Sequence, residues 1–361
     1  MARRRLMMLV VAALALLGAL PAAAEPVGNP AFQAVWARTD RPVAELHVSR
    51  TWMWGPAAYS NPTPEAYVES PNGRRTVQYF DKSRMEINQP GADPTGEWYV
   101  TNGLLAREML TGQIQFGENL FATFPRAQVN VAGDVDDPNG VTYATMSNVM
   151  GSAPLPNSAV ITQTIDHNGD VADGGALGGL LAQYHVSAVG VSAPTHHTVA
   201  SVFWDFMNSS GLVYDSASGQ EITAPLYSNP FYVAGYPLTE AYWTIVRVGG
   251  EGKRVLVQVF ERRVMTYTPD NPAGWQVEAG NVGQHYYAWR YGQLGNPTAA
   301  GVAATHNCGD FPSQLAAQLY FDFRGGSAGN NIEGLDSNRD GVPCESNPAP
   351  YSSQYRAQHP A

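Results

Sequence analysis

Two stretches of this 361-residue chain repeat one sequence pattern, and this internal echo constrains the fold more than any other feature. Each stretch, about 59–112 and about 198–292, carries a Glu-Ala-Tyr tripeptide that begins at Glu65 or Glu240. In both, a glycine with basic neighbours, a Val-Gln-x-Phe segment, a methionine, a tryptophan and a glycine follow in the same order. Ordered similarity of this kind predicts two diverged copies of one structural unit.

Each copy is expected to contain a β-hairpin, because its central segment is rich in β-branched and aromatic residues. The predicted strands are 75–80 and 84–87 in the first copy, and 253–260 and 264–267 in the second. Helices are predicted over 102–110 and 198–208, and Asn-Gly turns at 139–140 and 168–169 suggest strands within 113–190. The predicted fold of the body, residues 25–292, is therefore α+β with strands dominating.

Composition narrows the class of function. Hydrophobic residues make up 44% of the chain, which argues against wholesale disorder. The formal net charge is -10, and only 14% of the residues are charged. A general nucleic-acid-binding protein needs a basic surface, so no nucleic-acid partner is expected.

The first 24 residues have the pattern of a secretory signal peptide. Three arginines at 3–5 precede an almost wholly apolar run over 6–20, and the alanines at 22–24 offer a cleavage site before Glu25. The apolar run is shorter than the ~20 residues that a membrane-spanning helix needs. The sequence thus predicts a secreted, extracellular or cell-envelope protein with no integral membrane segment after cleavage.

The chain has two cysteines, Cys308 and Cys344. In an oxidising compartment an even number of cysteines predicts a disulfide, here a single bridge. The segment before them, 293–305, is small and uncharged and is interpreted as a linker. The segment 346–361 is expected to be a disordered tail.

Oxygen-bearing side chains recur at alternate positions shortly before the second cysteine. Asp336, Asn338 and Asp340 occupy positions 1, 3 and 5 of a loop, Gly341 permits a sharp turn, and Glu345 offers a closing carboxylate. Calcium takes six to eight oxygen ligands in flexible geometry, so this spacing suits it. The closing acid comes two positions earlier than in an EF-hand. An Asx-rich surface turn without any ion is the alternative.

Residues 306–345 resemble the Excalibur module, a short extracellular calcium-binding domain at the ends of bacterial secreted and surface proteins. The similarity lies in Asn-Cys-Gly-Asp-Phe at 307–311 and in Gly-Leu-Asp-x-Asn-x-Asp-Gly-x-x-Cys-Glu at 334–345. The resemblance implies a small helix-and-calcium-loop module closed by a Cys308–Cys344 disulfide. It also implies the calcium ligands Asp336, Asn338, Asp340 and Glu345. Because Asn338 stands where the family usually has Asp, and Arg339 adds a positive charge, weak calcium binding is expected.

The second copy of the repeat has a more distant resemblance. Gly-Tyr-Pro-Leu-Thr-Glu at 235–240, followed by Val-Gln-Val-Phe at 257–260, is similar to the LGFP-type repeats of bacterial cell-envelope proteins. That resemblance implies attachment to wall material. In the first copy it is weaker, because the corresponding segment lacks the glycine.

Glycan binding would require exposed aromatic rings that stack on sugar faces. The candidate rings are Trp52, Trp54, Trp98, Trp243, Trp275, Tyr286, Tyr287 and Trp289. Of these, Trp52, Trp54, Trp243 and Trp289 are the favoured stacking residues. Trp52 and Trp54 would share one face if they lay in a strand. For each of these tryptophans, a place in the hydrophobic core is the alternative.

Signatures of catalysis are mostly missing from the sequence. It has no G-x-S-x-G elbow, no H-E-x-x-H pair and no P-loop. His196-His197 and the acids at 134–137 are interpreted as polar turns rather than metal ligands. The sequence therefore favours an exported binding or structural protein with a calcium module and a cell-wall or surface glycan as partner. A secreted hydrolase of glycan, peptide or nucleic acid is the alternative.

Overall fold

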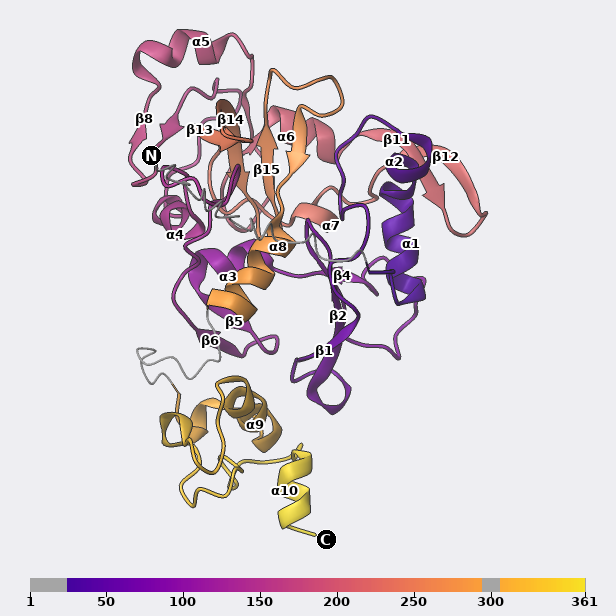
Figure 1. The fold of residues 1–361 in the computed structure, drawn as a ribbon, viewed down its shortest axis with the longest axis vertical. Helices are drawn as coiled ribbons and strands as arrows, with labels where there is room; N and C mark the ends of the chain where they lie inside the picture. The colour runs from indigo at the N-terminus through magenta and orange to yellow at the C-terminus, as the bar shows by residue number, and fades with distance from the viewer. Residues whose placement is uncertain (1–24, 294–305, 361) are drawn as a thin grey trace, which may run out of the picture.

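The computed structural model describes residues 25–293 and 306–360, with the side chains of 292 and 293 excepted. The predicted signal peptide and nearly all of the predicted linker lie outside these residues. The chain is α+β, as expected, with strands and short helices in both halves of the body (Figure 1). None of the described helices is long and apolar enough to cross a membrane.

The first half centres on a four-stranded antiparallel sheet. Its order is β1 (Thr63–Ala66), β2 (Arg74–Tyr79), β3 (Arg84–Ile87) and β4 (Thr101–Asn102). The helices of this half are α1 (Pro30–Thr39), α2 (Arg41–Leu46) and α3 (Leu105–Thr111). The predicted hairpin and the helix expected over 102–110 are therefore present.

The second half centres on a six-stranded sheet of order β16-β15-β14-β13-β7-β8. Its strands are β7 (Thr164–Ile165), β8 (Val171–Ala172), β13 (Tyr242–Val248), β14 (Glu251–Val259), β15 (Val264–Tyr267) and β16 (Val277–Ala279). The helix α8 (Val282–Tyr287) follows β16, and the predicted helix over 198–208 is α6 (Ser201–Met207). β7 and β8 form the hairpin expected around the second Asn-Gly turn.

Shorter elements fill the space around these sheets. They are β5 (Gln113–Gln115), β6 (Phe121–Thr123), β9 (Ala188–Val189), β10 (Val199–Ala200), β11 (Ser210–Asp215), β12 (Gln220–Pro225), α4 (Tyr143–Met146), α5 (Gly178–Ala182), α7 (Phe231–Ala234), and the helical turns η1 (Pro71–Gly73), η2 (Ser147–Val149), η3 (Gly175–Leu177) and η4 (Ala288–Gln293). The β11–β12 hairpin packs beside α1 and α2 at the edge of the body (Figure 1).

The two central hairpins have the same register. Tyr79 pairs with Arg84 across the β2–β3 turn, and Val259 pairs with Val264 across the β14–β15 turn. One backbone hydrogen bond of 2.8 Å closes each turn, from Phe80 or from Phe260. The repeated sequence pattern thus occupies matching positions in two hairpins of the same register.

A buried glutamine ties each hairpin to the segments that precede it. Gln78 Nε2 donates to the carbonyl oxygens of Pro26 and Ser60, both at 2.9 Å. Gln258 Nε2 donates in the same way to Thr198 at 2.7 Å and Thr239 at 2.9 Å. Both side chains are 0% exposed. The carbonyls bonded to Gln258 belong to buried residues, whereas those bonded to Gln78 belong to Pro26, which is exposed, and Ser60, which is partly exposed.

The halves of the body are bonded to each other in a crossed manner. The N–H of Arg107, in α3, donates to the carbonyl of Glu261 in the second hairpin turn at 3.0 Å. The N–H of Gln284, in α8, donates to the carbonyl of Asp81 in the first hairpin turn at 3.2 Å. Helix α8 can approach because a Cβ at Gly283 would lie only 1.9 Å from the Phe80 carbonyl oxygen. Each helix therefore caps the hairpin of the other half.

The C-terminal region is a small module built around α9 (Gln314–Phe323), with η5 (Cys308–Asp310) and η6 (Ile332–Gly334). Cys308 and Cys344 form the predicted disulfide, with their Cα atoms 5.3 Å apart. The module lies against the body at the β5–β6 end (Figure 1). There the ring of Phe323 contacts Phe116 and Phe124, with centroids at 4.4 and 5.5 Å.

The expectation of a disordered tail at 346–361 is wrong for the described residues. Helix α10 (Ser353–Gln358) forms there, and the Ser352 side chain caps it by accepting the Tyr355 N–H. Buried polar groups hold the preceding segment, because Gln314 Oε1 accepts the Ser352 N–H at 2.8 Å. Most side chains of this segment are exposed, and its order comes from the few that bond to the module, such as Asn347 and Ser352.

Candidate binding sites

The loop that starts at Asp336 curls around its own carboxylate. Asp336 is 0% exposed, and its oxygens accept the backbone N–H groups of Arg339, Asp340 and Gly341 at 2.9, 3.3 and 2.8 Å. Arg339 and Gly341 have positive φ angles of 59° and 90°, which give the tight curvature. Asp336 thus shapes the loop.

Three of the four predicted calcium ligands converge on the outer side of this loop. Asn338 Nδ2 donates to Asp340 Oδ2 and to Glu345 Oε2, both at 2.9 Å. Rotating the amide by half a turn exchanges its nitrogen for its oxygen, so Asn338 can also present an oxygen there. Side-chain oxygens of this kind suit a hard cation such as calcium.

Helix α10 lies beside these ligands. Glu345 Oε1 is 3.4 Å from His359 Nε2, and Gln358 Nε2 donates to the Asp340 carbonyl at 3.3 Å. No group of three or more His, Cys, Asp or Glu side chains is gathered as a metal site within the residues that the structure describes. The candidate calcium set depends on the Asn338 amide, which such a group does not include.

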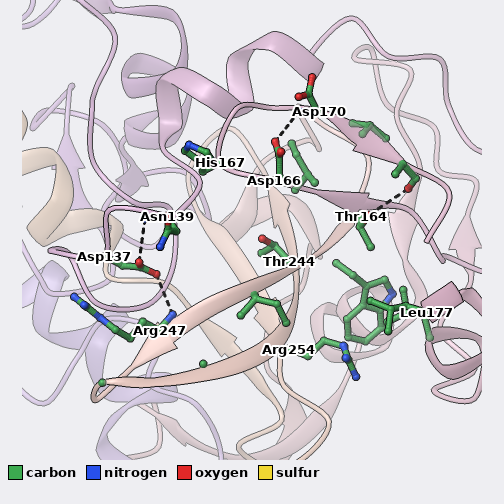
Figure 2. Close-up of a pocket in the computed structure, with 18 residues that line it drawn as sticks. Asp137, Asn139, Thr164, Asp166, His167, Asp170, Leu177, Thr244, Arg247 and Arg254 are labelled. Atoms are coloured by element: carbon green, nitrogen blue, oxygen red, sulfur yellow. Dashed lines mark hydrogen bonds between the residues drawn. The ribbon is translucent and has the colours of Figure 1, made fainter. Parts of the chain in front are cut away.

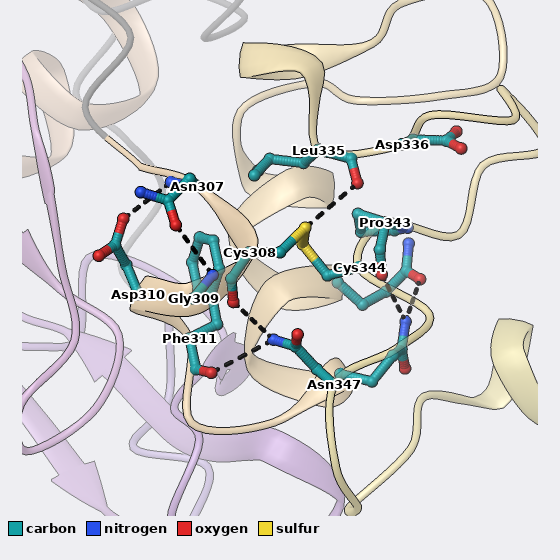
Figure 3. Close-up of a disulfide and its surroundings, with 12 residues drawn as sticks. Asn307, Cys308, Gly309, Asp310, Phe311, Leu335, Asp336, Pro343, Cys344 and Asn347 are labelled. Atoms are coloured by element: carbon teal, nitrogen blue, oxygen red, sulfur yellow. Dashed lines mark hydrogen bonds between the residues drawn. A yellow bond between two sulfur atoms is a disulfide. The ribbon is translucent and has the colours of Figure 1, made fainter.

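The disulfide fixes the end of the same loop (Figure 3). Asn347 Nδ2 donates to the carbonyls of Cys308 at 2.8 Å and of Phe311 at 3.2 Å, so the chain after Cys344 is held to the start of the module. Glu345 follows Cys344 directly, and the bridge therefore restricts where its carboxylate can lie.

Three of the four candidate stacking tryptophans are core residues. Trp54, Trp243 and Trp289 are each 1% exposed. The indole N–H of Trp243 donates to the Ile161 carbonyl at 2.8 Å, and that of Trp289 donates to the Pro125 carbonyl at 3.2 Å. Trp52 is partly exposed but lies in no strand, so it shares no strand face with Trp54. Burial of a ring whose N–H finds a carbonyl is the usual fate of tryptophan.

The exposed tryptophan beside a cavity is Trp98, which belongs to the wider set of candidate rings but not to the four that the sequence favours. Its ring is 46% exposed and lies 5.4 Å from the ring of Tyr232. Its neighbours Glu97 and Tyr99 line a cavity of about 470 Å³ between α1 and residues 94–100. Tyr227, Tyr232 and Ser228 line the same cavity. Aromatic rings with polar side chains between them are what sugar binding requires.

A larger cavity of about 650 Å³ lies over the edge of the six-stranded sheet (Figure 2). Its walls come from the β7–β8 hairpin, α5 and the β13–β14 pair. Asp166 accepts the N–H groups of Asn168 at 2.9 Å and Asp170 at 3.0 Å, so it closes the β7–β8 turn. The Asp170 N–H is the main reason that the pKa of Asp166 is lowered.

The acids at 134–137 hold the β13–β14 turn rather than lying free in solvent. Asp134 accepts the N–H groups of Gly249 and Gly250, both at 2.9 Å, and these bonds lower its pKa. Arg247 forms ion pairs with Asp134 and Asp136. This cluster therefore has a structural role.

The glutamates that recur in the repeat are both buried and fully bonded. Glu65 lies 3.0 Å from Arg84 Nη1 and 3.2 Å from Arg290 Nη1. Burial alone would raise the pKa of Glu65, but Arg290, Arg84 and Arg75 together lower it well below its usual range. Its carboxylate is engaged with these arginines and with the hydroxyls of Tyr79 and Tyr291, so Glu65 has a structural role.

Glu240 has a different partner in the second half. His197 Nδ1 lies 2.9 Å from Glu240 Oε1, and His197 Nε2 lies 3.0 Å from the Met150 carbonyl oxygen. Burial opposes the charged imidazole, but the hydrogen bonds to Glu240 and Met150 raise the pKa of His197 above its usual value. Both ring nitrogens thus have hydrogen-bond partners, which hold this histidine in place.

Comparisons with family models, with curated proteins and with solved structures find no match to this chain.

Proposed function

We propose that the chain is an exported, extracellular or cell-envelope binding protein whose C-terminal module binds calcium. The observation that carries the proposal is the convergence of Asn338, Asp340 and Glu345 on one point of a disulfide-closed loop. Two carboxylates and an amide oxygen, supplemented by backbone carbonyls and water, form a calcium-type ligand set. Arg339, within the loop, supports weak binding, in the millimolar range of extracellular modules (~10⁻⁴ to 10⁻³ M).

Asp336 has a separate part in this proposal. Its buried carboxylate already accepts three backbone N–H groups, so its first contribution is to hold the loop in the binding conformation. Calcium would also reduce the repulsion among the acids of this loop. Calcium should therefore raise the melting temperature of the module.

We further propose that the body binds a cell-wall or surface polysaccharide at the cavity beside Trp98. The exposed ring of Trp98 beside the cavity, and the partly exposed rings of Tyr99 and Tyr227 that line it, support stacking on sugar faces. The matched registers of the β2–β3 and β14–β15 hairpins support an origin of the body by duplication of one unit.

The calcium proposal is tested by calorimetric titration and thermal unfolding in Ca²⁺ and in Mg²⁺ at about 5 mM, well above the expected dissociation constant. The variants Asp340→Asn and Glu345→Gln keep the shape of each side chain and remove its charge. Both should abolish the Ca²⁺-dependent rise in melting temperature, while the exposed control Asp93→Asn should keep it. An equal response of all three variants to Ca²⁺ contradicts the proposal.

The glycan proposal is tested by retention on insoluble cell-wall polysaccharide. Trp98→Ala should lose retention, and Leu46→Ala, at another exposed apolar position, should retain it. If the parent protein is not retained, or if Trp98→Ala is retained equally, the Trp98 cavity is not the glycan site.

A further inference from the structure

The edge of β13 is only partly paired. On one side β13 pairs with β14 along its whole length, from Tyr242 to Val248. On the other side its pairing with β7 is confined to Trp243 and Thr164. Beyond that point, Arg247 is bonded by the loop at 134–137, since its N–H donates to Asp137 Oδ2 and its carbonyl accepts the Asp134 N–H. Ile245 lies between these two attachments.

The register shows which way the backbone of Ile245 points. The Trp243 N–H donates to the Gln163 carbonyl at 2.8 Å, so it points away from β14. Alternate residues of a strand direct their N–H and C=O groups to the same side, and Ile245 therefore points the same way. Within the described residues, no strand lies opposite Ile245 on that side. One donor and one acceptor are thus offered at strand spacing towards the cavity of Figure 2.

The cavity has mixed walls, in which the carboxylates of Asp137, Asp166 and Asp170 alternate with exposed apolar side chains. The Ile245 side chain is 55% exposed, and Val171 and Leu177, which also line the cavity, are 42% and 43% exposed. Apolar side chains that surround an unpaired strand edge are a feature of sites that accept an added strand.

The charge beside Ile245 indicates what the added strand carries. Arg254 lies directly opposite Ile245 in the β13–β14 register and lines the cavity (Figure 2). Arg247 is neutralised by Asp134 and Asp136, whereas Arg254 forms no ion pair with any described residue. Arg254 is partly exposed and so remains available to an external carboxylate.

We propose that this cavity binds an extended peptide that pairs with the backbone of Ile245 and places a Glu or Asp side chain on Arg254. The paired N–H and C=O distinguish a peptide from a sugar, because an extended main chain supplies the complementary acceptor and donor together. The exposed side chains of Val171 and Leu177 accept the neighbouring apolar side chains of the peptide. This site is separate from the proposed calcium loop and from the Trp98 cavity, and it does not depend on either.

Three fluorescein-labelled peptides test the proposal. They are eight-residue Val/Thr strands with a central Glu, Gln or Lys, and binding to the full chain is followed by fluorescence anisotropy. The Glu peptide should bind about tenfold more tightly than the Gln peptide, as expected for one charge-assisted contact, and the Lys peptide should bind most weakly. In Arg254→Gln the three peptides should bind equally.

Ile245→Pro isolates the backbone contact. Proline removes an N–H that bonds to no strand, so the hydrogen bonds of β13 with β14 remain. Ile245→Ala keeps the N–H and removes most of the apolar side chain. Binding of the Glu peptide should fall at least tenfold further in Ile245→Pro than in Ile245→Ala, with circular dichroism confirming that both variants fold.

Several outcomes overturn the proposal. The first is that the Glu peptide does not bind at about 1 mM, a concentration that half fills even a weak site with a binding free energy of about −4 kcal/mol. The second is that the parent protein binds the Glu and Lys peptides equally. Equal affinity of Ile245→Pro and Ile245→Ala would show that the peptide does not add to the β13 edge. If Ile245→Pro does not fold, the Arg254→Gln comparison alone decides the outcome.

Discussion

The ring of Phe323 at the end of α9 meets the ring of Phe116 edge-on, with centroids 4.4 Å apart, and this pair joins the C-terminal module to the body. Phe116 is fully buried, and Phe323 is half-buried. The module is therefore docked through a hydrophobic contact as well as through the chain that connects it to the body.

Truncating this contact should loosen the module. Because Phe323 is only half-buried, Phe323→Ala should cost about 2–3 kcal/mol, at or below the usual range for a core phenylalanine. A double-mutant cycle with Phe116→Ala, measured by urea unfolding, should give a coupling energy of about 0.5–1.5 kcal/mol. Strict additivity of the two substitutions would show that the rings do not stabilise each other.

The buried amides of Gln78 and Gln258 should both contribute to the free energy of unfolding. Gln258→Leu keeps the volume but leaves two buried carbonyls without donors, which should cost about 2–4 kcal/mol. Gln78→Leu should cost less, about 1–2 kcal/mol, because Pro26 is exposed and Ser60 is partly exposed, so water can replace the lost donor. Thermal and urea unfolding provide the measurement, and Gln113→Leu, at an exposed position of β5, is the control. If one variant loses much stability and the other loses none, the hydrogen bonds at the two matching positions contribute unequally to stability.

His285 should make the protein less stable in mild acid. Burial is the main cause that lowers the pKa of His285 to about 4, from a usual value near 6.5. Between these values the unfolded chain binds a proton that the folded chain does not, so stability falls as the pH falls from about 6.5 to 4. The loss amounts to about 3 kcal/mol.

Urea unfolding between pH 4 and 7 measures this slope. His285→Gln should flatten it, although the variant loses some stability at pH 7 because His285 Nδ1 is hydrogen-bonded to the Tyr143 hydroxyl at 3.1 Å. An unchanged slope in His285→Gln would assign the acid sensitivity to other groups.

The disulfide should stabilise the module more than the body. Cys308→Ser with Cys344→Ser should lower the free energy of unfolding by about 2–4 kcal/mol, because the cross-link restricts the unfolded chain. In this double variant, amide hydrogen exchange should accelerate more in α9 than in β14, relative to the parent protein. Reduction of the parent protein with dithiothreitol should reproduce the effect, and uniform acceleration in both elements would contradict it.

The sequence predicted the local structure well where the side-chain pattern itself determines it. The hairpin strands at 75–80 and 253–260 are β2 and β14, and the echo placed Gln78 and Gln258 at equivalent positions before their shared role was visible. Both predicted helices form, with starts displaced by three residues. The cysteine pair was correctly expected to form a disulfide.

The binding surfaces were harder to predict, because exposure is a property of tertiary packing. Trp54 and Trp243 are each 1% exposed and Trp98 is 46% exposed, although the residues around them in the sequence do not separate the three. The free edge at Ile245 arises from the early end of β7, which no local pattern reveals. The ordered segment before α10 depends on Gln314, far from it in sequence.

The hydrogen bonds from Arg107 to Glu261 and from Gln284 to Asp81 cross between the two halves of the body. Each half therefore needs the other to complete its hairpin turn. A fragment that ended near residue 150 would contain a hairpin turn without its capping helix, and the remaining fragment would have the same deficiency. Neither fragment should be stable alone, although a mixture of the two should reassemble. Duplication of a unit would in that case have produced a single cooperative domain, not two domains in tandem.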